Sequence, residues 1–433
     1  MVHDLTVGRL IVARRRAALL PNLVRLRWSY HDIPYTHWLP LFLGPNITTL
    51  SIAFYPEHAG ESRSFPNSIC DAVADVLKAA TELCPLLVNL EIRPAHGQNV
   101  INAAVSFAFK CKRLVGFKVT GASSPELLRH LASQESLRHV GILLDEEMVA
   151  DLPAIITPTS LRYPFPSLDT IVVHTPNMPS TTTLIRLMGR CRLRLIFFTY
   201  TAGAATTAEL LDLFRALHDH CSPTSLQEMI IQCAKGGVIN AHDYTLALDV
   251  LEPVLVFSNL RTFRLAIPMY CILNDYDLVQ IADHWPLMLD LRFLDGWKWI
   301  DYPEVTWAGV AYVAWRCPML YELVLAVDMT VENVEETTSR EGFRPNNHLR
   351  SLNLLDSPMH EPQACARAAH AFAPSLYEFC GHGRVEEQGD AEGDQEQRLP
   401  EQDPMAFYLT VNDLLKKLQK QQCDGGVDSE GGT

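Results

Sequence analysis

The sequence lacks the patterns that direct a chain into a membrane or out of the cell. None of the 433 residues lies in a run of about 18 consecutive apolar residues, so we expect no membrane span. The eleven cysteines have no short paired spacings, which argues against a secreted disulfide framework and favours a reducing compartment. Arg14, Arg15 and Arg16 follow a short apolar stretch, the reverse of the order in a secretory signal. These absences predict a protein of the cytoplasm or nucleus.

Positive charge is also scarce. The chain has 36 Lys and Arg against 50 Asp and Glu, a formal net charge of −14. Such a chain repels a phosphate backbone, so we expect no nucleic-acid partner. The sequence contains no Walker loop, dinucleotide-binding glycine pattern, nucleophile elbow or zinc-protease helix. We therefore expect no catalytic residue, no metal site, no cofactor and no enzymatic activity.

What the sequence does contain is a repeated spacing of apolar residues. Each copy has an apolar residue, two variable positions, a second apolar residue, one variable position and a third apolar residue. Alternate apolar positions predict a short strand with one buried face, and regular copies predict parallel strands stacked side by side. The thirteen copies begin at Leu23, Ile47, Leu87, Leu114, Leu137, Leu168, Leu193, Leu226, Leu260, Met288, Leu320, Leu349 and Leu376.

The segments between these copies have helical features. Thr206 and Glu209 have the spacing of a capping box, and apolar residues follow them on one helical stripe. Ser68 and Thr306 are predicted to cap two further helices. Strand and helix in alternation predict an α/β leucine-rich-repeat solenoid, an irregular arc like that of ribonuclease inhibitor. Its parallel strands should line the concave face and its helices the convex face.

Cysteine repeatedly ends a predicted helix just before the next strand, at Cys84, Cys111, Cys191 and Cys317. Free cysteine is small, apolar and among the most often buried residues. No paired ligand spacing accompanies these positions. We interpret them as packed corners of the repeat, with a redox or metal role as the less favoured alternative.

The predicted domain organisation has three parts. Residues 1–16 form an N-terminal extension, residues 17–381 the solenoid and residues 382–433 a tail. The tail has twelve Asp and Glu against five Lys and Arg, so we expect it to be mostly disordered. Residues near 405–421 have the pattern of a short amphipathic helix. This helix could dock on the last repeat or on a partner, but we favour a solvated helix that frays.

Four phrases resemble a known family: LLPNLVRLRW, LPLFLGPNITTLSI, ELCPLLVNLEI and VTWAGVAYVAWRCPMLYELVL. They are similar to the leucine-rich-repeat region of fungal F-box proteins, particularly those of mushroom-forming fungi, over roughly residues 17–380. The resemblance implies a substrate receptor of a cullin-type ubiquitin ligase, in which an F-box binds a Skp adaptor and the repeats hold the target.

The chain departs from that family at its N-terminal end. The first copy of the repeat begins at Leu23, which leaves no room for a helical F-box ahead of it. We therefore expect either a member without its F-box or a decoy that binds targets without delivering ubiquitin. A Skp adaptor and a cullin would be partners only if an F-box lies upstream.

The variable positions between the apolar residues should point out of the concave face, where solenoids bind their partners. They carry both signs of charge, which suits a protein partner better than a polyanion. For each of them the simpler interpretation is a solvated strand face. The candidate partner-binding residues on the predicted strands are Arg25, Arg27, Glu91, Lys118, His174, Arg264 and Arg292.

A second candidate is the segment from Asp295 to Tyr302, which brings Trp297, Trp299 and Tyr302 together in the sequence. Large aromatic side chains dominate interface hot spots, so this segment is a candidate anchor. The alternative is that the tryptophans pack over a repeat edge. The expected function is protein binding. A scaffold unrelated to ubiquitin is the alternative, and a solenoid enzyme is the least favoured.

Overall fold

Parallel strands alternate with helices along the chain, which confirms the α/β repeat predicted from the apolar spacing. The chain divides into two compact parts. Unit 1 comprises Met1–Pro176 and Ser180–Phe198, and unit 2 comprises Asn177–Pro179 and Thr199–Thr433. The computed structural model describes residues 19–30, 33–54, 67–93, 97–119, 121, 124–156, 164–201, 205–234, 243–294, 303–331, 333–355, 357, 361–381 and 404–424.

The strands of unit 1 are hydrogen-bonded in the order in which they follow one another in the sequence. They pair in register, so that Leu26, Leu50, Leu90, Phe117 and Val140 lie opposite one another across neighbouring strands. Each of these is the middle apolar residue of a repeat copy. The strands are β1 (Arg25–Tyr30), β2 (Thr49–Phe54), β3 (Asn89–Arg93), β4 (Gly116–Val119), β5 (His139–Leu143), β6 (Thr170–Thr175) and β7 (Leu195–Tyr200).

Unit 2 continues the same pattern. Met229, Phe263, Leu291, Leu323 and Leu352 are the paired middle residues of successive strands. Each of the thirteen copies of the apolar pattern thus coincides with one of the thirteen strands that pair in parallel. The strands are β8 (Glu228–Cys233), β10 (Thr262–Ala266), β12 (Asp290–Phe293), β13 (Glu322–Val324), β14 (Ser351–Asn353) and β15 (Glu378–Cys380), with a separate small pair of β9 (Thr245–Leu246) and β11 (Tyr270–Cys271).

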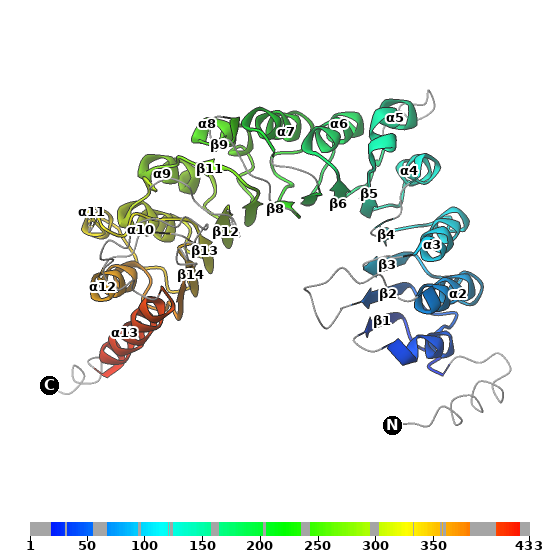
Figure 1. Ribbon diagram of the computed structural model, residues 1–433, viewed down its shortest axis with the longest axis horizontal. Coiled ribbons are helices and arrows are strands. Elements are labelled where there is room, and N and C mark those ends of the chain that lie inside the picture. Colours follow the sequence, from blue (N-terminus) through cyan, green and yellow to red (C-terminus); the bar gives the residue numbers. More distant parts are fainter. Residues whose placement is uncertain are drawn as a thin grey trace, which may run out of the picture. The chain divides into compact units, whose positions relative to one another are not determined.

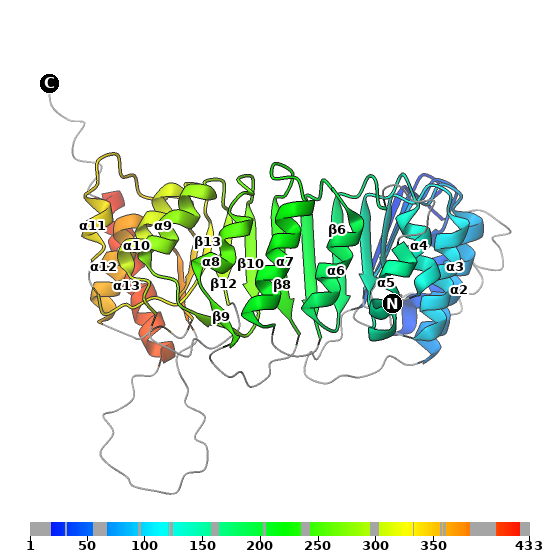
Figure 2. The same cartoon turned by 90° about the horizontal axis from the view of Figure 1, so that it is seen from above.

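In each unit the described helices that connect the strands lie on one face of those strands (Figure 1), and Figure 2 shows the same layering from above. We call the other face of each unit its open face. None of the described helices has the length and hydropathy needed to cross a bilayer. The helices are η1 (Ile33–Phe42), α2 (Asn67–Leu83), α3 (Gln98–Lys110), α4 (Pro125–Ala132), α5 (Glu146–Ile156), α6 (Met178–Met188), α7 (Thr207–His220), α8 (Leu248–Leu251), η3 (Glu252–Val254), α9 (Asp275–His284), α10 (Trp307–Arg316), α11 (Glu335–Thr338), α12 (Pro362–Phe372) and α13 (Pro404–Asp424).

The core of each unit lies between the strands and the helices. The apolar positions of the repeat fill it: Leu50, Phe117 and Phe263 are each 0% exposed. In unit 2 the ring of Phe263 lies 4.9 Å from that of Trp285, between centroids. Burying one such side chain contributes about 1.5–3 kcal/mol. The residues that alternate with these apolar positions point to the open face and do not pack into the core between the strands and the helices.

The helix starts agree with the sequence in two of the three cases. Thr206 and Glu209 form the predicted capping box, and the hydroxyl of Thr306 accepts from the backbone N–H of Ala308. The prediction for Ser68 was wrong, because α2 begins one residue earlier, at Asn67. Ser68 therefore lies within the first turn of α2 and not ahead of it.

Cys84, Cys111 and Cys317 directly follow the last residues of α2, α3 and α10, as predicted, whereas Cys191 lies three residues beyond the end of α6. Cys84 and Cys317 are 3% and 1% exposed, whereas Cys111 and Cys191 are partly exposed. The thiol of Cys317 donates to the carbonyl of Trp285 at 3.3 Å, and burial raises the pKa of Cys317 to about 12. This thiol therefore stays protonated, which fits the structural interpretation.

Helix α13 packs on the last repeat, so the interpretation of a solvated, fraying helix was wrong. Phe407, Val411 and Leu415 form an apolar stripe that is almost fully buried. The side-chain amide of Asn412 accepts from the N–H of Phe379 at 2.9 Å and donates to the carbonyl of the same residue at 2.8 Å. Asn412 thus makes the two backbone bonds that a further strand would make to β15.

Candidate functional site

The open face of unit 1 presents its variable positions as two rows that cross the strands. They arise because neighbouring strands pair in parallel register, which places equivalent residues side by side. The first row consists of Arg25, Thr49, Asn89, Gly116, His139 and Thr170. The second row consists of Arg27, Ser51, Glu91, Lys118, Gly141 and Val172.

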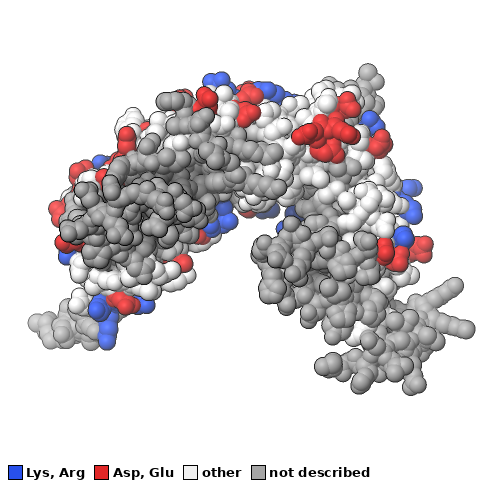
Figure 3. Space-filling model, in the orientation of Figure 1, with Lys and Arg blue, Asp and Glu red and all other residues white. Residues whose placement is uncertain are grey.

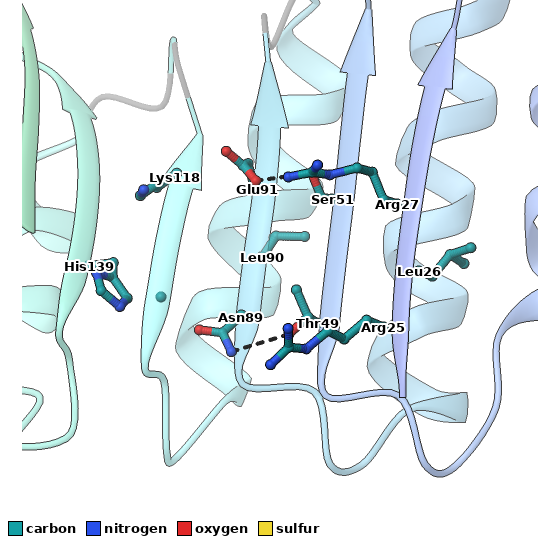
Figure 4. Close-up of a pocket in the computed structure, with 11 residues that line it drawn as sticks. Arg25, Leu26, Arg27, Thr49, Ser51, Asn89, Leu90, Glu91, Lys118 and His139 are labelled. Atoms are coloured by element: carbon teal, nitrogen blue, oxygen red, sulfur yellow. Dashed lines mark hydrogen bonds between the residues drawn. The ribbon is translucent and has the colours of Figure 1, made fainter. Parts of the chain in front are cut away.

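A hollow of about 540 Å³ lies over these rows between β1 and β5 (Figure 4). Polar side chains line it, and the two leucines beside them belong to the middle apolar positions. We call it the unit 1 hollow. Its lining residues are Arg25, Leu26, Arg27, Thr49, Ser51, Asn89, Leu90, Glu91, Gly116, Lys118 and His139.

Two glycines shape this part of the sheet. A Cβ atom at Gly116 would lie 2.6 Å from Oδ1 of Asn89, and one at Gly141 would lie 3.2 Å from Cα of Lys118. Both distances are shorter than ordinary contacts. Glycine inside a strand often marks such a close approach. Here it gives Asn89 room over β4 and Lys118 room over β5.

Hydrogen bonds fix the middle of the hollow. The amide of Asn89 donates to the hydroxyl of Thr49 at 3.3 Å, and the hydroxyl of Ser51 donates to Glu91 at 3.0 Å (Figure 4). Glu91 also forms an ion pair with Arg93 at 2.5 Å. Glu91, the one carboxylate among the described residues that line the hollow, is therefore already bonded on both sides.

The cations of the hollow have no such partner. Among the described residues, no ion pair joins Arg25, Arg27 or Lys118 to a carboxylate. Burial lowers the pKa of Lys118, and the nearby charge of Arg93 lowers it further, while Glu91 opposes both. Along the helical side, by contrast, Lys and Arg side chains lie close to Asp and Glu side chains (Figure 3). The hollow is a local concentration of positive charge in an acidic chain.

Two histidines on the same open face have pKa values that burial and nearby cations lower. Burial lowers the pKa of His139, and the cation of Lys118 adds to the effect. Burial also lowers the pKa of His174 on β6, followed by the charge of Arg93. Both imidazoles are therefore held neutral at pH 7 and become cations only in acid.

The structure brings together four of the residues singled out in the sequence: Arg25, Arg27, Glu91 and Lys118 all line the hollow. His174 lies on the same open face but does not line it. Arg264 and Arg292 belong to unit 2. Trp297, Trp299 and Tyr302 lie outside the described residues.

In unit 2 the two predicted arginines are bonded to carboxylates. Asp290 is 1% exposed and accepts from Nε of Arg264 at 2.9 Å and from Nε of Arg292 at 2.8 Å. Arg292 also donates to Glu322 at 2.7 Å. Tyr321 donates its hydroxyl to Asp290 at 3.3 Å. This network neutralises its own charges, which indicates a structural role for Arg264 and Arg292.

Several residues of the hollow were not among the candidates from the sequence. Thr49 and Ser51 flank Leu50 as Arg25 and Arg27 flank Leu26. The repeat spacing contains that signal, because both residues occupy the variable positions on either side of a middle apolar residue. Gly116 carried a second signal, because glycine within an alternating strand pattern suggests a close approach.

Comparison with known proteins assigns no role to this site. No protein-family model matches the chain, and no curated protein matches it. The function of the open face is therefore argued from its own geometry and charge. These offer cationic groups and hydrogen-bond donors to an anionic or polar chain segment.

Proposed function

We propose that the chain is a protein-binding module of leucine-rich-repeat type, and that the unit 1 hollow holds the target. The observation that carries this proposal is the group of cations, Arg25, Arg27 and Lys118, that have no ion-pair partner among the described residues. Lys118 loses part of its hydration without gaining a salt bridge. A bound carboxylate would offset that cost, which favours a complementary acidic partner.

The resemblance to fungal F-box proteins extends the proposal. In that family the repeats hold a protein that is to be marked with ubiquitin. We propose that the target in the hollow is such a substrate when an F-box, a Skp adaptor and a cullin complete the assembly. The same surface would serve a stand-alone binding module equally well, so the test must separate target binding from adaptor binding.

The test compares two charge-reversed variants of the full chain. The first is Arg27→Glu with Lys118→Glu in the hollow. The second is Lys78→Glu with Lys110→Glu on the exposed faces of α2 and α3 in the same unit, which alters the net charge equally. Each tagged chain is recovered from its own cell extract after cross-linking, and bound proteins are quantified by mass spectrometry.

We expect proteins that the wild type and the helix variant retain but the hollow variant loses. If the recovered set is identical for both variants, the hollow does not hold the target and the proposal is wrong. Recovery of a Skp adaptor and a cullin by all three chains supports the ligase role. A hollow-dependent target without them supports a stand-alone module.

A further inference from the structure

We infer that the outer edge of β1 is a second binding surface, which takes up an extended partner segment of alternating apolar and acidic residues as an added strand. This surface lies beside the unit 1 hollow but differs from it, because recognition depends on backbone hydrogen bonds and not on the cations. The inference therefore goes beyond the proposed function. It follows from a contrast between the two ends of the strand order.

Strand β1 is the first in the strand order and pairs on one side only, with β2. The carbonyl of Val24 accepts from the backbone N–H of Thr49 at 3.3 Å, and Arg25 lies opposite Thr49 in register. Neighbouring residues of a strand direct their backbone groups to opposite sides, so those of Arg25, Arg27 and Ser29 point away from β2. Within the described part of the chain, no hydrogen bond reaches these outward groups.

The first repeat is also less covered than the repeats behind it. Leu26 is 8% exposed, whereas the middle apolar residues Leu50 and Leu90 are 0% and 1% exposed. Trp28 is partly exposed, whereas Ile52, its paired residue on β2, is fully buried. Stacked repeats bury their apolar positions against a neighbour on each side, and β1 has a neighbour on one side only. An added strand with apolar residues at alternate positions would supply the second neighbour.

The other end of the strand order is sealed. Strand β15 has three residues, and the side-chain amide of Asn412 bonds to both backbone groups of Phe379. Phe407, Val411 and Leu415 of α13 are at most 4% exposed where this helix packs on the last repeat. Unpaired edge strands readily accept another strand, and proteins commonly block the edges that must stay free. Strand β1 has six residues and no such block among the described residues.

The charge of β1 identifies the kind of segment that fits. Arg25 and Arg27 share the open face, and neither forms an ion pair among the described residues. Figure 4 shows both side chains lying across β2, so they leave the outer edge uncovered. Pairing with β1 of a second copy would bring the arginines of both copies together, and like charges on paired strands destabilise a sheet. Acidic side chains on the open face of an added segment would instead complement them.

The experiment measures fluorescence anisotropy of a labelled peptide, Thr-Glu-Val-Glu-Val-Glu-Val-Thr, with the full chain. Strand addition uses the backbone groups on one side of the peptide, so N-methylation of two valines and N-methylation of two glutamates should have unequal effects. We expect one methylated form to bind at least about ten-fold more weakly than the parent, and the other within about two-fold of it. Loss through the valines indicates a parallel strand, and loss through the glutamates an antiparallel one.

Variants of the edge test the same contact from the protein side. Ser29→Pro removes one outward N–H, and an edge strand tolerates proline where the missing N–H faces away from the sheet. We expect Ser29→Pro to weaken the parent peptide at least about five-fold, whereas Ser29→Ala should bind as the wild type does. Ser29 does not line the hollow, so both variants keep its cations. A peptide with lysine in place of each glutamate should bind the wild type more weakly than the parent does.

Equal affinity of the two methylated peptides would overturn the inference, since the peptide would then not bind as an added strand. A dimer in sedimentation velocity that Ser29→Pro abolishes would also overturn it, because a second copy would then occupy the edge. The proposed function fails separately, if the proteins bound from the extract do not depend on Arg27 and Lys118. Circular dichroism checks the folding of Ser29→Pro, and the methylated peptides decide the question with the wild type alone if that variant unfolds.

Discussion

In unit 2 the arginines of the open face, Arg264 and Arg292, are bonded to a carboxylate on the same or the neighbouring strand. In unit 1, by contrast, no ion pair among the described residues joins Arg25, Arg27 or Lys118 to a carboxylate. Arg264 and Arg292 occupy paired positions on β10 and β12, where two like charges would repel each other. Asp290 accepts hydrogen bonds from both. In unit 1, Glu91 lies opposite Lys118 in register, yet its bonds go to Ser51 and Arg93.

This difference shows that charged residues at equivalent repeat positions form ion pairs in unit 2, whereas Arg25, Arg27 and Lys118 of unit 1 form none among the described residues. The sequence indicated one face of mixed charge. The structure separates the charges into a neutralised network in unit 2 and a positive hollow in unit 1. If this separation is functional, substitutions in the two open faces should affect different properties of the protein.

The largest expected effect is on the stability of unit 2. Asp290→Asn should destabilise it by about 3 kcal/mol, because two partly buried guanidinium groups would lose the charge that pairs them. Urea unfolding, followed by amide exchange on β10 and β12, measures this change. Asp283→Asn is the control, since its pair with Arg316 is exposed and should be worth less than about 1 kcal/mol. If both variants lose the same unfolding free energy, the network around Asp290 does not have the structural role assigned to it.

The edge of unit 2 should show the next largest effect. Asn412→Ala removes both side-chain bonds to the backbone of Phe379 and should cost about 1–2 kcal/mol. Faster amide exchange at Phe379 is the direct measurement. Thr410→Ala, two residues earlier on the exposed side of α13, is the control. If exchange at Phe379 is unchanged in Asn412→Ala, α13 does not seal β15 as the structure indicates.

A smaller effect of the opposite sign is expected in unit 1. Burial lowers the pKa of Lys118, so its charged form is less stable in the folded chain than in the unfolded chain at pH 7. Lys118→Met should therefore raise stability, by less than about 1 kcal/mol because water screens part of the penalty. Arg292→Met in unit 2 should lower stability in the same urea experiment. A loss of stability in both variants would contradict the contrast between the two faces.

The smallest expected effect is a pH dependence of stability that comes from two histidines of unit 1. Burial lowers the pKa of His139 and His174 below 6.5 in the folded state, so the unfolded chain takes up protons first as the pH falls. Their contribution to stability is complete above pH 6.5 and is lost as the pH falls through the folded pKa. In the double variant His139→Gln with His174→Gln, the unfolding midpoint should change less between pH 7 and pH 5 than it does in the wild type.

The charged groups around His139 set the direction of a second effect. Lys118, Arg194 and Arg138 oppose its protonation and Asp169 favours it. Once protonated, His139 adds a cation to the hollow, so an acidic peptide should bind more tightly at pH 5.5 than at pH 7.5. Unchanged affinity over this range in the wild type would show that His139 does not contribute to the bound surface.

Much of the candidate site could be read from the repeat. Once Leu26, Leu90 and Phe117 are placed inward, the residues on either side of them must point outward, which identified Arg27, Glu91 and Lys118. The spacing could not show that Ser51 and Arg93 bond to Glu91. It also could not show that Gly116 gives Asn89 the room to lie over β4.

The apolar spacing by itself predicted the thirteen strands of the main parallel array and the faces they bury, because a strand's side-chain alternation is a local property of consecutive residues. It did not predict the small separate pair of β9 and β11. Which charges meet depends on partners far apart in the sequence, such as Arg264 and Asp290, which register between neighbouring strands brings into contact. Burial of Asp290 and the packing of α13 on β15 likewise depend on the assembled core. Tertiary structure therefore decided which charged positions are neutralised and which remain without an ion pair among the described residues.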